Sequence, residues 1–462
     1  MNINFNLRIF SFNWKISISK QWLQFGIIMT VLLAAVIISY WVSPVLIFWL
    51  LVLLGGISMV LLLLGQPNIG FVLLFLAGFV PYEGPGHINA SALMAALLIA
   101  LWVLDMLVVK RSFQFVNSRT LLPVFVFLVV SVVAFGMGQV PWFVFANQAP
   151  LDAQVGGFAI FALSIGLLLL TAHRIQDLRW LKIIMWVFIG IGTMYVLGRT
   201  ARFSYIDQLY PYGLAAGSMF WVWLVTLTLS QAMYNTHLKI PIRVLLVLIV
   251  LMTFYVAYVQ ANDWKSGWVP PLVCVGVLLA IRYKQLIIFA VPVALLAVVY
   301  VAGILVASDE YSWGTRVDAW IIILTISRVS PLLGMGFANY YWYTPLFPIR
   351  GWPVSFNSHS QYVDLIAEVG VIGLLCFLWI FLEMGKVSWR LGNQLPDGFA
   401  RAYSYGVLAG IAGTLMAAFL VDWVLPFAYN IGFSGFRASI FPWIFFGGLI
   451  SIEQIYLGKM KS

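Results

Sequence analysis

The chain has 462 residues, of which 63% are hydrophobic and only 9% are charged, and its mean hydropathy is +1.01. No soluble globular class reaches that balance, so the composition indicates a polytopic membrane protein. The formal net charge of +10 comes mostly from loops that we assign to one side of the membrane, so it gives no reason to expect a nucleic-acid partner.

The N-terminal segment, residues 1–24, is basic and carries apolar residues at alternate positions over 3–9 and again over 12–18. A cleavable signal would need a short apolar core directly after the charges and a small-residue cleavage site, and the segment has neither. We therefore expect residues 1–24 to form a cytoplasmic segment that rests on the membrane surface.

Apolar segments occupy most of the remaining chain. They lie at residues 25–41, 45–64, 69–81, 89–109, 120–138, 155–172, 178–197, 213–233, 241–259, 267–282, 285–306, 361–384, 402–424 and 433–457. Because a helix of about 20 residues crosses a hydrocarbon core of about 30 Å, they predict an all-α polytopic transmembrane helical bundle of about fourteen spans. The third and tenth segments are short, so a bundle of about twelve or thirteen spans is the alternative.

Three parts follow from this pattern. Residues 25–306 hold the first eleven helices, residues 307–360 form a large loop with short helices, and residues 361–462 hold the last three helices and a short tail. If the N-terminus is cytoplasmic, most of the 25 Lys and Arg residues fall on the inside. This asymmetry is the positive-inside pattern, so we expect both termini in the cytoplasm and the large loop outside.

A few cations are left outside, where the insertion bias disfavours them. Arg199 and Arg202 precede the eighth span, Lys265 lies between the ninth and tenth, and Arg316 opens the large loop. Cations that converge on one point would bind an anion such as a pyrophosphate, for which arginine offers a bidentate fork. The alternative is that each cation is solvated or pairs with a nearby carboxylate of Asp207, Asp263, Asp309 or Asp318.

His359 lies at the outer end of the twelfth span. There it can act as a general base at neutral pH, hydrogen-bond a substrate oxygen, or simply cap the helix. Asp364 and Glu368 follow one helical turn apart and share a face. Ionisable groups are costly inside a membrane, so we expect these two to orient loops or cations, unless they are structural carboxylates satisfied by backbone donors.

Other polar residues have simpler explanations. Asp422 and Arg437 fall near the outer ends of the last two spans, and we expect them to form an ion pair. The aromatic segment 340–353 suits the membrane–water interface, although with Arg350 it could also hold sugars. The two cysteines lie within apolar runs and the four histidines are scattered, so we predict core thiols and no protein-bound metal.

The large loop and the span after it carry a set of motifs. These are Arg316-x-x-x-Trp320, Pro-Leu-Leu-Gly-Met-Gly at 331–336, His359 followed by Tyr362-x-Asp364, and Glu368-x-Gly-x-x-Gly373. The set resembles the O-antigen ligase and polymerase superfamily of bacterial membrane proteins, closely over 316–375 and more loosely upstream. Arg202 resembles an upstream arginine of the family, and Lys265-Ser266-Gly267 stands where the family often has Ser-Arg-Gly. The chain departs from the family in having Ser360 after the histidine, where asparagine is usual.

The resemblance implies a metal-independent glycosyltransferase without cofactors, in the bacterial cytoplasmic (inner) membrane, with its active site facing outside. Such an enzyme moves a glycan from undecaprenyl pyrophosphate to a glycan or lipid A core acceptor during O-antigen or exopolysaccharide synthesis. A chain-length regulator protein is a further partner that it could have. The resemblance makes His359 and Arg316 catalytic, with His359 as general base or acceptor positioner. The remaining implied site residues are Arg199, Arg202 and Lys265 for the pyrophosphate, and Asp318, Tyr362, Asp364 and Glu368 in support.

Two questions stay open at this level. The motifs do not separate a ligase, which transfers a finished polymer to lipid A core, from a polymerase, which extends a lipid-linked chain. A polysaccharide or lipid-linked glycan transporter or flippase is the alternative class, because intramembrane carboxylates also suit transport. Against it, the hydropathy shows no internal repeat of the kind that relates the two halves of many transporters. A non-catalytic scaffold would leave the outside cations and histidine without a role.

Overall fold

The computed structural model describes residues 3–9, 12–18, 26, 29–31, 33, 43–210, 214–215, 217–260, 265–286 and 310–461. The chain divides into two units, Met1–Gln66 and Pro67–Ser462. Most of the expected spans 25–41 and 285–306 lies outside the described residues.

The described part of the first unit contains an antiparallel hairpin and a long helix. Strands β1 (Ile3–Ile9) and β2 (Phe12–Ile18) pair with Ile3 opposite Ile18. The alternating apolar residues have the two-residue period of a strand, which explains the local structure. The helix α2 (Pro44–Gly65) begins at Ser43, whose side-chain oxygen accepts a 3.3 Å hydrogen bond from the Leu46 amide. The membrane-surface location of the hairpin segment stays a prediction.

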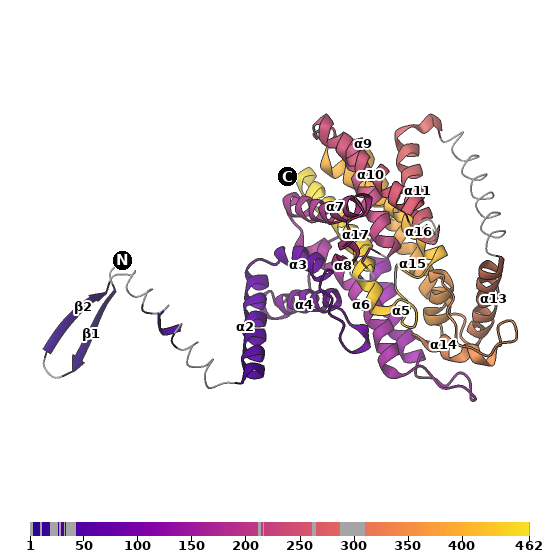
Figure 1. Cartoon of the computed structure of the whole chain (residues 1–462), viewed down its shortest axis with the longest axis horizontal. Helices are drawn as coiled ribbons and strands as arrows, with labels where there is room; N and C mark the ends of the chain where they lie inside the picture. The colour runs from indigo at the N-terminus through magenta and orange to yellow at the C-terminus, as the bar shows by residue number, and fades with distance from the viewer. Residues whose placement is uncertain are drawn as a thin grey trace. The chain divides into compact units, whose positions relative to one another are not determined.

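The second unit is helical throughout its described part (Figure 1). Its helices are α3 (Ile69–Ala77), α4 (Ala90–Leu104), α5 (Leu121–Met137), α6 (Leu151–Arg174), α7 (Leu178–Thr200), α8 (Ile206–Leu209), α9 (Ser218–Tyr234), α10 (Ile240–Tyr255), α11 (Lys265–Arg282), α13 (Glu310–Ile326), α14 (Asn339–Tyr343), α15 (Gln361–Gln394), α16 (Phe399–Leu420) and α17 (Gly432–Lys461). Single π-helical turns, Asp105–Val109 and Val256–Gln260, extend α4 and α10.

Eight helices of the described residues are long and apolar enough to cross a bilayer, which supports a polytopic helical membrane protein. Two further apolar helices, α5 and α11, are somewhat shorter. Where a span was expected over 69–81, the helix α3 has only nine residues. At 1.5 Å per residue such a helix is too short to cross a hydrocarbon core. The full number of spans therefore stays a prediction.

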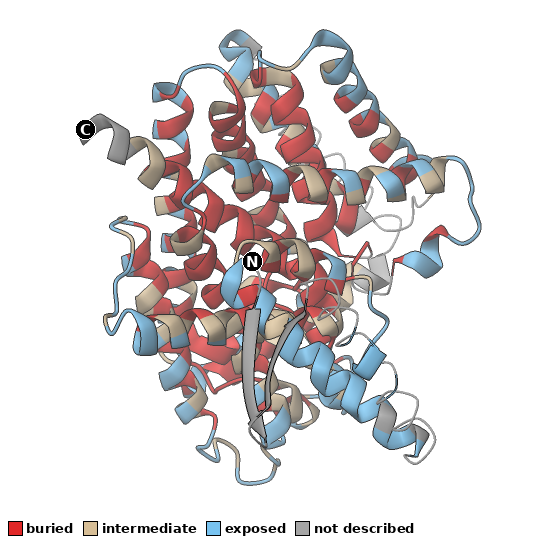
Figure 2. Cartoon of the chain, turned by 90° about the vertical axis from the view of Figure 1, so that its left-hand side faces the viewer, coloured by how far each residue is buried: buried red, intermediate tan, exposed pale blue. Residues whose placement is uncertain are grey.

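The core of the second unit lies around α9, which is buried along nearly its whole length. Figure 2 shows that buried residues fill the interior of the helical part, with exposed residues at its periphery. Helices α16, α11, α10 and α17 pack around it. Its aromatic residues Trp221 and Trp223 are among the largest fully buried side chains. A helix that is apolar and buried all round is typical of the centre of a membrane bundle.

Ion pairs gather the cation-rich loops at one end of this bundle. Arg174 at the end of α6 lies 2.8 Å from Asp105 at the end of α4. Arg390 near the end of α15 pairs with Glu453 near the end of α17, and Glu453 also accepts a 2.6 Å hydrogen bond from Ser118, just before α5. The loops that we assigned to one side of the membrane therefore meet one another, although which side this is stays a prediction.

Candidate functional site

At the opposite end, the turn Pro331–Gly336 is inserted into a break in α15. Gly370 has φ 74° and ψ 179°, so the helix is interrupted there. The amides of Val371 and Ile372 donate to the carbonyls of Pro331 (2.9 Å) and Leu332 (3.2 Å). In the other direction, the amides of Met335 and Gly336 donate to the carbonyls of Ala367 (2.8 Å) and Glu368 (3.0 Å). The turn thus supplies the partners that the broken helix lacks.

Glycine is required at three points of this junction because backbone meets backbone. A β carbon on Gly334 would collide with the carbonyl of Glu368, and one on Gly370 would collide with the carbonyl of Leu332. A β carbon on Gly336 would collide with the backbone of Gly138, at the end of α5. All three glycines of the motif also have positive φ, which L side chains rarely adopt. The motif therefore encodes a backbone junction between the large loop, α15 and α5.

Two buried carboxylates fasten the following loop to α15. Asp364 accepts hydrogen bonds of 2.6 Å from the hydroxyls of Tyr340 and Ser358. Glu368 accepts a 2.8 Å bond from the amide of Ala338. Burial, together with the Asp364 charge, raises the pKa of Tyr340 well above its ordinary value, so this phenol remains a neutral donor. Asp364 thus holds the loop through two side-chain hydroxyls and Glu368 through one backbone amide, and their supporting role at the site stays a prediction.

His359 is half-buried and stands immediately before α15, with an unusual φ of 49°. Its Nδ1 lies 3.4 Å from the amide nitrogen of Asn430, which also donates to Asp422 Oδ1 at 2.7 Å. With the amide nitrogen assigned to this position, Nδ1 accepts and Nε2 carries the proton of the neutral ring. Burial and the nearby Arg316 both lower the pKa of His359, so the ring is neutral at pH 7.

Arg316, on α13, lies close to this histidine. Its Nη1 donates to the carbonyl of Leu420 at 3.4 Å, and its guanidinium stands 6.0 Å from the ring of Trp313. Burial raises the pKa of Asp422 to about 6, whereas the charge of Arg316 acts in the opposite direction. Arg316, His359 and Asp422 are therefore neighbours, although they come from α13, the start of α15 and the loop after α16.

The other supporting residues have packing roles. Asp318 lies 2.7 Å from Arg350, so the arginine that could have held a sugar is engaged in an ion pair. Trp320 Nε1 donates to the carbonyl of Ser358 at 2.7 Å, which holds the residue before His359. The hydroxyl of Tyr362 donates to the carbonyl of Leu415 at 2.7 Å and links α15 to α16.

The upstream cations are arranged differently. Arg199 forms an ion pair of 2.6 Å with Asp207, as the alternative from the sequence held. Arg202 is exposed, with φ 56°. Lys265 begins α11, but its side chain lies outside the described part of the chain. Their role in binding a pyrophosphate stays a prediction.

The expected ion pair between Asp422 and Arg437 is wrong. Arg437 is buried and donates to the carbonyl of Tyr82 at 3.1 Å, so it faces the loop between α3 and α4. Asp422 turns instead toward its own loop, where Asn430 and the amide of Phe427 (3.3 Å) supply its donors. The local donors satisfy the carboxylate without a cation, which the positions of the two residues along the chain could not show.

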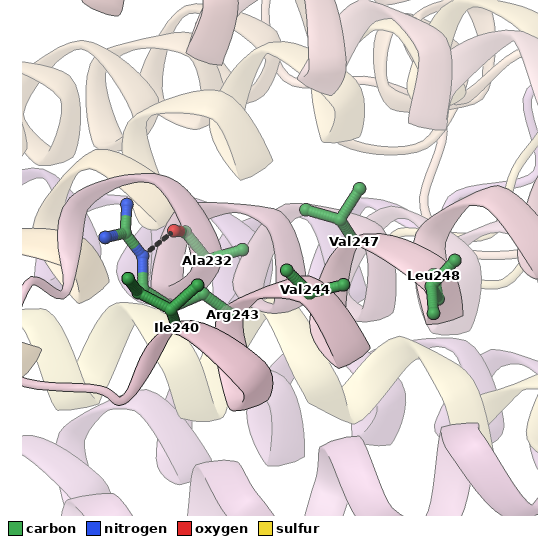
Figure 3. A pocket seen from close by; sticks show the side chains of 6 residues that line it. All are labelled: Ala232, Ile240, Arg243, Val244, Val247 and Leu248. Atoms are coloured by element: carbon green, nitrogen blue, oxygen red, sulfur yellow. Dashed lines mark hydrogen bonds between the residues drawn. The ribbon is translucent and has the colours of Figure 1, made fainter.

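A metal site or a surface hollow would be another kind of binding site in the described residues. Among the described residues, no group of three or more His, Cys, Asp or Glu side chains is placed to hold a metal ion. An open hollow of about 310 Å³ lies between α9 and α10, at the cation-rich end (Figure 3). There Arg243 Nε donates to the carbonyl of Ala232 at 2.7 Å, so its guanidinium caps the last turn of α9.

Several residues of the site were not singled out from the sequence. Asn430, Tyr340 and Ser358 are uncharged, and their types are common in loops and interfacial belts. Asn430 lies in the short connection between two apolar spans, and nothing in the sequence marks it as a partner of Asp422. Only the folded chain places its amide between a carboxylate and an imidazole.

Known proteins add no identification. No protein-family model matches the chain, and no curated protein is significantly similar to it. Its function is therefore argued from the residues and their arrangement.

Proposed function

We propose that the protein is a membrane glycosyltransferase of the O-antigen ligase and polymerase type. It would transfer a glycan from undecaprenyl pyrophosphate to an acceptor sugar on the extracytoplasmic face of the bacterial inner membrane. The observation that carries the proposal is the meeting of Arg316 and His359 next to the Asp422–Asn430 pair, at the end of the bundle away from the cation-rich loops.

The proposed reaction is a single displacement at the anomeric carbon of the donor sugar. The acceptor hydroxyl oxygen forms the new bond, and the bond from the anomeric carbon to the pyrophosphate oxygen breaks with its electron pair on the leaving group. The hydroxyl proton passes to a water molecule, and the configuration inverts. Arg316 stabilises the charge that grows on the pyrophosphate, where its bidentate fork is most effective.

His359 has two candidate roles, and the Asn430 contact favours one of them. A general base needs an unprotonated nitrogen facing the acceptor hydroxyl. Because Asn430 donates to Nδ1, the other nitrogen carries the proton and presents a donor. We therefore favour His359 as the group that positions a substrate oxygen by donating from Nε2. The fixed Asp422–Asn430 pair would hold this tautomer, as outer partners commonly orient an imidazole.

Arg199, Arg202 and Lys265 remain proposed secondary contacts for the pyrophosphate. Arg202 is exposed, whereas Arg199 would first have to leave Asp207. The acceptor, and hence the distinction between ligase and polymerase, is to be settled by assay.

The decisive experiment is reconstitution of the purified protein with an undecaprenyl-pyrophosphate oligosaccharide, with products read on a gel. We expect Arg316→Ala to lower transfer by about 10²-fold or more, as loss of a transition-state charge contact does. Arg328→Ala is the matched control, because Arg328 is exposed in the 3-10 turn Ser327–Val329 directly after α13. Full activity of Arg316→Ala would overturn the pyrophosphate role.

The acceptor is tested in the same system. A ladder made without another acceptor identifies a polymerase, and transfer only to added lipid A core identifies a ligase. Movement of the lipid-linked oligosaccharide across the bilayer, without any transfer, would replace the proposal with the transporter alternative.

A further inference from the structure

The loop between α5 and α6, residues 138–150, ends in two fully exposed apolar side chains. Val144 is 89% exposed and Phe145 is 92% exposed, the highest values among the large hydrophobic side chains that the structure describes. Leaving such side chains in water forfeits the favourable free energy of burying them. A pair of them at one loop tip therefore points to an apolar environment around the tip.

The base of this loop is held firmly. Trp142 Nε1 donates to the carbonyl of Met137 at 3.1 Å, and the amide of Ala149 donates to Asn339 Oδ1 at 2.8 Å. The ring of Phe143 packs on that of Tyr343, with centroids 4.9 Å apart. The tip is thus presented from a fixed base that contacts α14.

Three observations identify lipid as the partner of the tip. The loop joins α5, an apolar helix, to α6, a helix of membrane-crossing length, so its ends lie where the chain leaves and re-enters the bilayer. Residues 138–150 contain no Asp, Glu, Lys or Arg. Trp142 and Phe143 directly precede the tip, and aromatic side chains of this kind favour the membrane–water interface. A protein-docking patch would instead be expected to have a polar rim.

We propose that residues 138–150 form a membrane-anchoring finger, whose tip Val144-Phe145 inserts into the lipid leaflet on the side of the candidate site. The finger contacts α14 through Asn339 and Tyr343, and Phe143 also packs on Phe347, with centroids 5.8 Å apart. It therefore ties the loop that precedes His359 to the bilayer surface. Resting on the proposed function, this would hold the site at the depth of the pyrophosphate of a membrane-embedded polyprenyl donor.

Site-directed fluorescence tests the insertion directly. Phe145→Cys is labelled with an environment-sensitive fluorophore and reconstituted in phosphatidylcholine vesicles containing nitroxide-labelled lipid, with the unsubstituted protein as the labelling blank. The two native cysteines, Cys274 and Cys376, are buried, so the background should be low. Asn147→Cys is the matched control, because Asn147 is exposed in the same loop but polar.

We expect the label at residue 145 to be quenched several-fold more by the lipid nitroxide than the label at 147, and to be shielded from aqueous iodide. Equal iodide quenching at both positions would overturn the proposal, because the tip would then lie in water. Shielding of residue 145 from both quenchers would overturn it too, because a protein surface would then cover the tip.

The functional consequence has a separate readout. Phe145→Asp should lower transfer in vesicles several-fold while leaving its thermal unfolding in detergent unchanged. If the wild-type protein transfers no glycan, the proposed function fails, but the quenching result still decides whether the finger inserts. Unchanged transfer by Phe145→Asp in vesicles would contradict the link between the finger and the site.

Discussion

The turn Pro331–Gly336 and the loop after α7 both bring predicted site residues to the fold, but they are held in opposite ways. The turn is fixed to α15 by backbone hydrogen bonds that run in both directions across a helix break. The loop after α7 is fastened by the ion pair of Arg199 with Asp207, whose carboxylate side chain is 52% exposed. The first arrangement leaves no room for a β carbon on its glycines, and the second remains open to solvent and salt.

The residues of the two regions therefore matter for different reasons. Glycines in the turn are required by backbone geometry, so replacing them should lower the stability of the folded protein. Cations in the loop act through side-chain charge, so their loss should leave the fold almost unchanged. Substitutions in the two regions should therefore have effects of different size, and they should affect different properties of the protein.

The largest effect is expected at the helix break. Gly370→Ala should destabilise the protein by about 3 kcal/mol or more, because a positive φ costs an L-residue about 1–2 kcal/mol and the β carbon also meets the Leu332 carbonyl. Thermal unfolding in detergent measures this. Gly385→Ala, in the same helix, is the matched control, since its β carbon would meet only Leu408 at 4.0 Å. Similar melting of both variants would contradict a strained junction.

A smaller loss is expected from the carboxylate that fastens the loop to α15. Tyr340→Phe removes one of the two hydroxyl donors to the buried Asp364 and should cost about 1–3 kcal/mol of unfolding free energy. Tyr341→Phe, next along α14, keeps its ring stacked on Tyr429 and should be nearly neutral. Chemical denaturation in detergent compares the two, and equal losses would show that the Asp364 bond is not the cause.

The pH dependence of transfer tests the protonation states of His359 and Asp422. The pKa of His359 is lowered by burial and by Arg316, whereas burial raises the pKa of Asp422 to about 6. Both groups therefore gain protons on the acid side of neutrality, where a protonated Nδ1 can no longer accept from Asn430. We expect transfer to be level from about pH 7 to 8 and to fall by about tenfold or more per unit at lower pH.

The pH–rate profiles of the unsubstituted protein and of Asp422→Asn test this expectation. With Asp422→Asn only His359 still titrates, so the acid limb should become shallower, whereas its alkaline plateau should keep its width. If Asp422→Asn left the acid limb unchanged, Asp422 would have no part in holding the tautomer of His359.

The smallest effect is expected in the loop after α7. Arg199→Ala should change the free energy of unfolding by about 0–1 kcal/mol, because partly exposed ion pairs contribute little. Unfolding measured at low and at high salt provides the check, since the contribution of the pair should shrink as salt screens it. A loss comparable to that of Gly370→Ala would mean that this loop is as firmly built as the turn.

Part of the candidate site was predictable from residue types. Arg316 and His359 stood out because a cation and a titratable ring are rare beside apolar spans, and the structure makes them neighbours. The ion pair of Asp422 with Arg437 was predicted wrongly, because position along a span does not reveal which way a side chain faces. Asn430 could not be predicted, because an uncharged amide in a loop carries no distinctive signal until its partners are known.

The sequence by itself determined that the protein is a multi-pass helical membrane protein. Its composition is strongly apolar, and its apolar segments have the length that a helix needs to cross the hydrocarbon core of a bilayer. Only the structure showed that the glycines of the two motifs meet in one backbone junction, where a β carbon would collide with backbone. Only the tertiary structure decided which polar groups meet: that Asp364 holds Tyr340 and that Asn430 stands between Asp422 and His359. The physical reason is that membrane insertion depends on the hydropathy and length of one contiguous segment, whereas hydrogen-bond partners come from segments that are far apart in the sequence.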